Sequence, residues 1–140
     1  MKRRKAREYA LQMLFQLDFT ARAYDEKGIE EFWSDKKEKS DVKKFAVELV
    51  KGTLSNLEKI DTMIETVTEN WLLKRMAAVD RNILRFAAYE ILFRKDIPSA
   101  VTINEALEIA KKYSTHESAQ FVNGVLDSIK NNLTNDEESE

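Results

Sequence analysis

Residues 80–93, with the sequence DRNILRFAAYEILF, constrain the fold of this chain more than any other segment. After Asn82 the only charged residues are Arg85 and Glu90, and on an α-helix the apolar side chains would cover most of the circumference. A helix that is apolar on most sides is normally surrounded by other elements. Asp80 is suited to cap such a helix, because its carboxylate can accept hydrogen bonds from N–H groups of the first turn. We therefore expect this segment to be the central helix of an all-α domain.

The composition favours a single helical domain. The chain has 140 residues, of which 43% are apolar and 34% are charged, with three glycines and one proline. This length is sufficient for one core, and the small number of turn-forming residues favours helices over strands. The absence of cysteine excludes disulfides, thiolate catalysis and cysteine-bound zinc. Because no apolar run approaches the roughly 18 residues that span a bilayer, we expect a cytoplasmic protein that does not enter a membrane.

The spacing of apolar residues predicts about seven helices, including the central one. The other six cover residues 2–19, a short stretch after residue 28, and residues 42–70, 72–79, 103–113 and 117 to about 133. The helix over residues 42–70 is expected to be continuous and bent near Gly52, since its apolar stripe keeps its phase across that glycine. Two pairs, Thr102 with Glu105 and Ser114 with Glu117, match the capping box that opens many helices.

Charge is concentrated at the two ends of the chain. Residues 2–7 read KRRKAR and hold five cations, whereas residues 136–140 read DEESE and hold four carboxylates. Cations at the start of a helix oppose the helix dipole, and local conflicts of this kind are expected at functional sites. The end of the chain is too polar to bury a core. We expect residues 1–133 to form one domain and residues 134–140 to form an acidic, disordered tail.

The sequence lacks the residue patterns that indicate catalysis or metal binding. Its single histidine, His116, lies beside a predicted cap, and no Glu-x-x-His motif accompanies the glutamates, so a metal site of the bundle type is not expected. The glycines are isolated and form no phosphate-binding loop, and no serine has the context of a nucleophile elbow. We therefore expect a protein that is not an enzyme and that has no cofactor or metal.

Two interpretations remain open on the residues alone. In the first, the cations of residues 2–7 neutralise nucleic-acid phosphates, and Phe15 and Phe121 stack on unpaired bases. Phe15, together with Leu11, lies nearly opposite the main apolar face of its predicted helix, and Phe121 lies on the flank of the last helix. In the second, the chain is a scaffold whose basic end is solvated and whose two phenylalanines belong to the edge of the core.

Four stretches resemble the NusB family of bacterial transcription antitermination factors. They are RRKAREYALQMLFQ, VDRNILRFAAYEILFRKDIP, INEALEIAKKY and FVNGVLDSI, and they run in order from residue 3 to about residue 130. The resemblance implies two packed subdomains, each roughly a three-helix bundle. It also implies a partner, the small-subunit ribosomal protein NusE. Together with NusE, members of this family bind the boxA element of nascent ribosomal RNA leaders and help RNA polymerase to resist termination.

The resemblance also implies roles for individual positions. The implied RNA surface consists of Lys2, Arg3, Arg4, Lys5, Arg7, Phe15, Glu117, Gln120 and Phe121. Gln120 stands where many members of the family carry a lysine. The implied NusE contact lies around Glu69, Arg75, Asp80 and Arg81. NusB-like domains also precede the catalytic domains of ribosomal RNA cytosine methyltransferases, so a helical scaffold or accessory domain without RNA specificity of its own is the alternative. Whether the chain is a monomer or a homodimer stays open.

Overall fold

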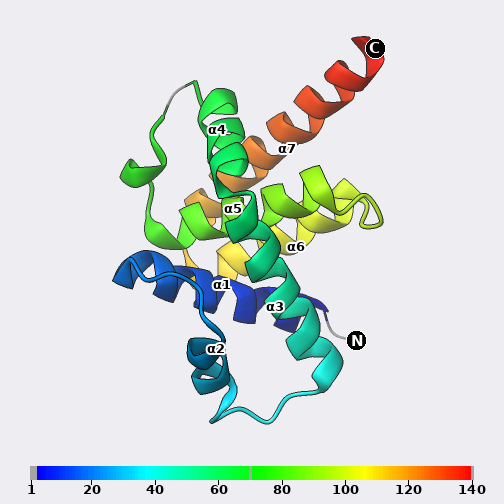
Figure 1. Ribbon diagram of the computed structural model, residues 1–140. Helices are drawn as coiled ribbons and strands as arrows, with labels where there is room; N and C mark the ends of the chain where they lie inside the picture. Colours follow the sequence, from blue (N-terminus) through cyan, green and yellow to red (C-terminus); the bar gives the residue numbers. More distant parts are fainter. Residues whose placement is uncertain (1–2, 70, 140) are drawn as a thin grey trace.

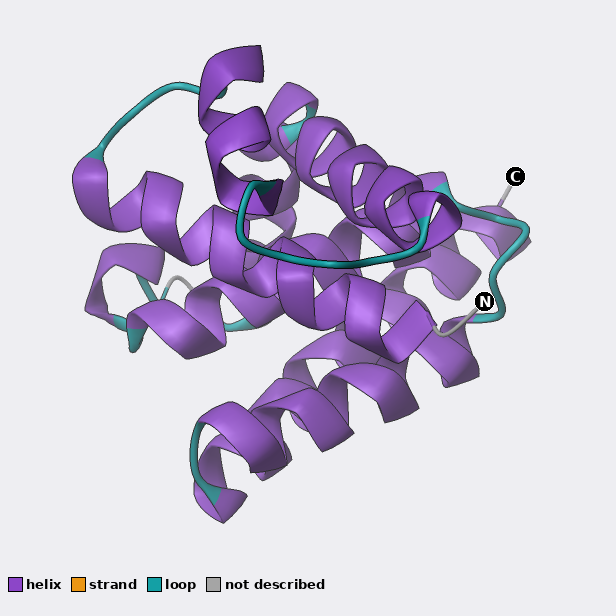
Figure 2. Ribbon diagram, turned by 90° about the horizontal axis from the view of Figure 1, so that it is seen from below, coloured by secondary structure: helices purple, strands orange, loops and turns teal. Residues whose placement is uncertain are grey.

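The computed structural model describes residues 3–69 and 71–139, with only the backbone described for residues 134–139. These residues form seven α-helices and one 3-10 helix, η1, and contain no strand (Figure 1, Figure 2). The helices are α1 (Arg3–Thr20), α2 (Glu26–Trp33), α3 (Ser40–Ser55), α4 (Leu57–Val67), η1 (Leu73–Arg75), α5 (Ala78–Phe93), α6 (Ser99–Tyr113) and α7 (His116–Ser139). The expected all-α class with about seven helices is confirmed.

Helix α5 is the central element, as residues 80–93 predicted. It packs against α1, α3, α4, α6 and α7, and it crosses the middle of the molecule in Figure 1. Ala87 and Ala88 are fully buried. Gly52 of α3 lies so close to α5 that a Cβ atom at this position would come within 2.1 Å of the Tyr89 ring. Gly52 is therefore a close-packing position and not the bend that the sequence predicted.

The single helix predicted over residues 42–70 is wrong, because the chain turns at Asn56 and forms two helices. Asn56 adopts φ −118° and ψ 20° between α3 and α4. Its side-chain amide donates to the carbonyl oxygen of Gly52 at 2.8 Å, a local bond of the kind that competes with helix continuation. The apolar phase continues across the turn, since Ile60 and Ile64 of α4 are fully buried. An apolar stripe that keeps its phase therefore did not distinguish one helix from two.

The caps predicted for α5 and α6 are also wrong. Helix α5 begins at Ala78, so Asp80 lies within the first turn rather than before it. Helix α6 begins at Ser99, directly after Pro98. Thr102 is consequently inside α6, and its buried hydroxyl donates to Glu90 of α5 at 2.8 Å. In both cases the polar side chain bonds a neighbouring helix: Asp80 accepts from Ser118 of α7, and Thr102 donates to Glu90 of α5.

The last helix is capped by Thr115 and not by Ser114. The Thr115 hydroxyl accepts from the backbone N–H of Ser118 at 2.9 Å, which is the bond that an N-cap residue makes. Ser114 instead ends α6. The backbone of α7 continues to Ser139, but the acidic tail expected over residues 134–140 lies outside the residues whose side chains are described, and it stays a prediction. Within the described parts of the chain, no helix is long and apolar enough to cross a membrane.

Candidate nucleic-acid interface

Arg4 and Lys5 at the start of α1 are exposed but engaged with carboxylates. The Arg4 guanidinium binds Glu105 of α6 through two nitrogens, with the Nη2–Oε1 distance at 3.1 Å. Lys5 Nζ lies 3.1 Å from the carboxylate of Glu38, in the connector between α2 and α3. The guanidinium of Arg3, which is half-buried, lies 4.6 Å from the centre of the Phe45 ring. The remaining predicted contact of this cluster, Lys2, lies outside the described residues.

These contacts favour the charged forms of Arg4 and Lys5. The hydrogen bond to Glu105 raises the pKa of Arg4 above its ordinary value, and the bond to Glu38 does the same for the pKa of Lys5. In return, the hydrogen bond from Lys5 lowers the pKa of Glu38. Arg4 and Lys5 are therefore protonated near neutral pH, and each lies directly beside a carboxylate group.

Arg7 is not at the surface with the other cations. Its side chain is 2% exposed and makes two bonds to the Glu90 carboxylate, Nε–Oε2 at 2.7 Å and Nη2–Oε1 at 2.8 Å. Glu90 is fully buried and also accepts from the Thr102 hydroxyl. This arrangement ties α1 to α5 and α6. Because the Arg7 donors bind Glu90 in the core, this arrangement does not favour the phosphate contact predicted for Arg7, and that role stays a prediction.

Phe15 lies further along α1, beside an aromatic ring that is almost fully exposed. Its ring is half-buried and parallel to that of Phe19, with 6.3 Å between the ring centres and 6° between the planes. Phe19 itself is 80% exposed. Leu11, which was expected to share the off-core side with Phe15, is buried. The two phenylalanines border a groove of about 850 Å³ between α1 and α2, whose wall also includes Tyr113 at the end of α6.

The start of α7 presents the other predicted RNA residues. Glu117 and Gln120 are exposed, and Phe121 is half-buried. The Phe121 ring meets that of Trp71 edge to face, with 4.9 Å between the ring centres. Trp71 is 47% exposed, and it was not singled out in the sequence because it continues the apolar stripe of the helix predicted over residues 42–70. Phe121 therefore lies beside a second, partly exposed aromatic ring.

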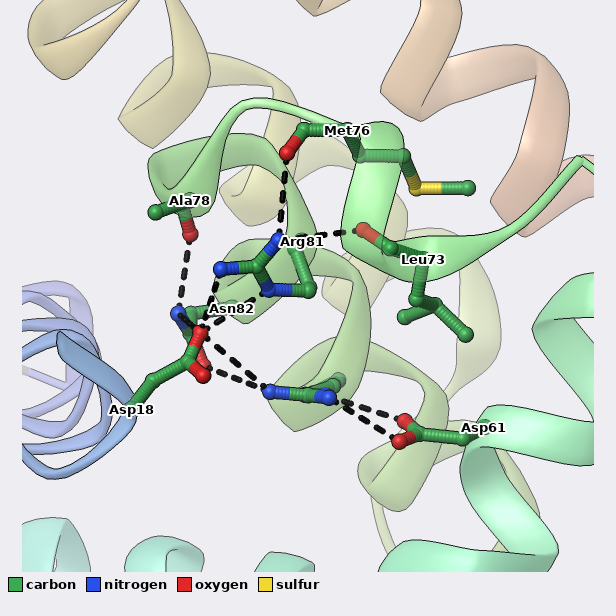
Figure 3. A network of polar contacts seen from close by, with 8 residues as sticks. Asp18, Asp61, Leu73, Met76, Ala78, Arg81 and Asn82 are labelled. Atoms are coloured by element: carbon green, nitrogen blue, oxygen red, sulfur yellow. Dashed lines mark hydrogen bonds and ion pairs between the residues drawn. The ribbon is translucent and has the colours of Figure 1, made fainter. Parts of the chain in front are cut away.

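The four residues expected to contact NusE differ in their exposure. Glu69 is exposed and has a positive φ of 57°, and Arg75 in η1 is also exposed. Asp80 is buried, with Oδ2 accepting from the Ser118 hydroxyl at 2.9 Å and no hydrogen-bond partner for Oδ1 among the described atoms. Arg81 points inward, where it donates to the carbonyl oxygens of Leu73 and Met76 and so holds η1 against α5 (Figure 3).

Arg81 belongs to a polar network that joins three helices. Figure 3 shows Asp18 of α1 facing Arg81 and Asn82 of α5. Arg85 of α5 forms ion pairs with both Asp18 and Asp61 of α4. Burial acts to raise the pKa of Asp18. The hydrogen bonds from Asn82 and Arg81 and the charges of the two arginines outweigh it, so the pKa of Asp18 lies below its ordinary value. The network fixes the end of α1, and with it Phe15 and Phe19, relative to α5.

Comparison with known proteins identifies the family. Residues 4–131 match the NusB family model. The transcription antitermination protein NusB of Desulfitobacterium hafniense (strain DCB-2) is 51% identical over 99% of this chain and 94% of its own length. That of Thermodesulfovibrio yellowstonii is 49% identical over 92% of this chain and 91% of its own length. Because these proteins are antitermination factors, the comparison supports the expectation that the chain is not an enzyme.

Solved structures have the same fold. A solved structure of T. maritima NusB superposes with a TM-score of 0.85 at 44% identity, over 94% of this chain and 92% of that one. A chain from the crystal structure of the antitermination factors NusB and NusE in complex with dsRNA gives a TM-score of 0.81 at 28% identity, over 94% of this chain and 98% of that one. The match of fold and sequence along almost the whole length shows that this chain belongs to the NusB family of transcription antitermination proteins.

Proposed function

We propose that this chain is an RNA-binding antitermination factor that acts in the cytoplasm with a NusE ribosomal protein. In this proposal the pair binds boxA RNA in nascent ribosomal RNA leaders and joins the antitermination complex of RNA polymerase. The observation that carries the proposal is the similarity, over 94% of the chain, to the chain crystallised with NusE and dsRNA. The exposed cations and partly exposed aromatic rings described above supply the chemistry that RNA binding requires.

The proposed RNA surface runs from the start of α1 to the start of α7. Arg3, Arg4 and Lys5, with Lys2 before them, would neutralise phosphates, and each such contact releases counterions. Phe15 and Phe121 would stack on unpaired bases, and Glu117 and Gln120 would accept or donate hydrogen bonds beside Phe121. Arg7 is left out, because its guanidinium is bound by Glu90 in the core.

The proposed NusE surface centres on Glu69 and Arg75, which are both exposed. Asp80 and Arg81 support this surface from below rather than forming it, since one is bound to Ser118 and the other to the carbonyl oxygens of Leu73 and Met76. Exchanging the charge of Arg75 (Arg75→Glu) should therefore weaken NusE binding without changing the free energy of unfolding.

Fluorescence anisotropy of a labelled boxA RNA tests the function. The RNA is titrated with this chain, with NusE, and with an equimolar mixture of the two, at a low and a near-physiological salt concentration. We expect the mixture to bind more tightly than either protein alone and to bind a scrambled RNA of the same length more weakly. Equal binding of the scrambled RNA by the mixture would refute the proposal. Light scattering of the same samples separates a monomer from a homodimer.

A pair of matched variants tests the role of the basic helix start. Arg4→Ala should weaken binding to both RNAs and reduce the slope of log affinity against log salt by about 0.7, the value expected for one lost phosphate contact on a single strand. Lys59→Ala removes one exposed cation from α4, which packs against α3, α5 and α7, and it should leave both quantities nearly unchanged. Identical behaviour of the two variants would argue against a phosphate contact at Arg4.

A further inference from the structure

Three glutamates each hold one cation on the surface around α1. Glu105 of α6 binds Arg4 with an Nη2–Oε1 distance of 3.1 Å. Glu38, before α3, binds Lys5 at 3.1 Å, and Glu8 of α1 binds Lys112 of α6 at 2.6 Å. The carboxylates come from three different elements, so no single helical repeat accounts for their convergence on neighbouring cations. We call Glu8, Glu38 and Glu105 the carboxylate set.

The two members of each pair differ in how firmly they are held. The side chains of the carboxylate set are between 10% and 20% exposed, whereas those of their cations are between 49% and 63% exposed. Two of the carboxylates have further donors. Glu38 accepts from the Tyr9 hydroxyl at 2.9 Å, and Glu8 accepts from the Tyr113 hydroxyl at 2.8 Å. The acids are therefore fixed in the scaffold, while the cations are long, exposed side chains that can turn toward a ligand.

We propose that the carboxylate set competes with RNA phosphates for Arg4, Lys5 and Lys112, and so keeps the sequence-independent RNA affinity of the free chain low. This inference rests on the proposed RNA-binding function and adds Lys112 to the RNA surface. A phosphate that binds one of these cations must replace a carboxylate that stays in place. The displaced carboxylate then lies beside the RNA backbone, where like charges repel. Arg4 and Lys5, which read as strongly basic in the sequence, thus add little net positive charge at α1.

The consequence concerns when the chain binds RNA. Exposed ion pairs are weak, so the carboxylate set does not prevent binding, and RNA that also gains base stacking can displace it. RNA that offers only phosphates gains much less from the exchange. The set therefore lowers binding to bulk RNA and leaves selection to Phe15, Phe121 and the protein partner.

The neutral variants Glu105→Gln and Glu38→Gln test this inference, because glutamine keeps the shape of the side chain and removes its charge. The probe is a labelled scrambled RNA, titrated into the chain without a partner across a series of salt concentrations. Each variant should bind several-fold more tightly at low salt than the unaltered chain, with a salt slope steeper by about 0.7 for each released cation. Glu58→Gln is the matched control, since it changes the net charge equally at an exposed position of α4.

A double-variant cycle separates local competition from a general change in charge. In an Arg4→Gln background, Glu105→Gln should no longer raise the affinity beyond the effect of Glu58→Gln, because the cation that it competes for is absent. Affinities of Glu105→Gln and Glu38→Gln that equal that of Glu58→Gln would overturn the inference. A fall in affinity would also overturn it, because the carboxylates would then be orienting the cations for RNA. Failure of the proposed function is distinct, since the unaltered chain with NusE would then not distinguish boxA from scrambled RNA.

Discussion

The buried ion pair between Arg7 and Glu90 gives the sharpest test of how α1 is fixed. Glu90→Gln keeps the volume of the side chain but removes the only carboxylate that the structure records at the Arg7 guanidinium. The Arg7 side chain cannot move to solvent easily, because it is 2% exposed and lies between Glu90 of α5 and the Phe45 ring. The variant therefore leaves a full charge in the core without a counter-charge.

The expected destabilisation is large for a single isosteric change. Removing one partner of a buried ion pair typically costs about 3–5 kcal/mol, because the remaining charge is not compensated. A domain of this size has a total stability of about 5–15 kcal/mol, so the variant should lose a substantial part of it. Replacing the whole group with apolar residues of similar volume is often neutral or stabilising. We therefore expect the triple variant Arg7→Met, Glu90→Met, Thr102→Val to be at least as stable as the unaltered chain.

Urea denaturation followed by circular dichroism measures both variants, with the free energy of unfolding taken from linear extrapolation. A decrease in the free energy of unfolding below about 1 kcal/mol for Glu90→Gln would refute the reasoning, because exposed ion pairs typically contribute no more than that. The triple variant also tests the assignment of Arg7 to the core. If Arg7 has no contact with RNA, the triple variant should bind boxA RNA with unchanged affinity and an unchanged salt slope. A slope reduced by about 0.7 would return Arg7 to the RNA surface.

Three further predictions use single substitutions. Gly52→Ala should destabilise the fold by about 1–3 kcal/mol through overpacking against Tyr89. Gly124→Ala, with no atom within 4 Å of the added Cβ, should instead stabilise α7 by about 0.5–1 kcal/mol. Shifts of the denaturation midpoint in the same direction for both variants would contradict this. Asp18→Asn should be less stable than the unaltered chain near pH 7. The folded state lowers the pKa of Asp18, so the ionised carboxylate stabilises the fold above its unfolded pKa of about 3.9. The difference in the free energy of unfolding between the two proteins should therefore shrink as the pH falls below that value. A constant difference down to pH 2 in urea titrations would exclude the ionised group as the cause. Phe15→Ala should weaken boxA binding by about 1–3 kcal/mol if the ring stacks on a base, and an unchanged affinity in anisotropy titrations would assign the ring to the groove wall.

Most of the helices could be predicted from the sequence because their apolar residues recur on one face that packs against the core, but their ends could not. The turn at Asn56 leaves the apolar phase intact, since Ile60 and Ile64 continue to face the core. A pattern that repeats every 3.6 residues reports which residues are buried and not whether the axis changes direction. Thr102 failed as a predicted cap for a related reason. Its best hydrogen-bond acceptor is Glu90, 12 residues away on another helix, and local capping rules contain no information about such a neighbour.

At the candidate site, too, the sequence predicted local features but not the contacts between helices. The basic cluster of residues 2–7 was recognisable, but its members have three different environments: Arg4 on a carboxylate of α6, Arg3 on the Phe45 ring, and Arg7 in the core. A count of charged residues does not distinguish between these three environments. The exposure of Trp71 beside Phe121 was equally hidden, because it depends on where the segment before η1 meets α7.

A signal for the buried pair was nevertheless present in the sequence, in two charges that break otherwise apolar patterns. Arg7 stands three, four and seven residues before Ala10, Leu11 and Leu14, which are all buried on α1, so helical geometry puts it on the core face. Glu90 stands alone near the end of the most apolar helix in the chain. A charge on a buried face needs an opposite charge or a proton, and the simplest way to satisfy two such positions is for each to meet the other. Misplaced charges of opposite sign on two core helices therefore predict a contact between those helices, and here that contact would have oriented α1 on α5 without any structural information.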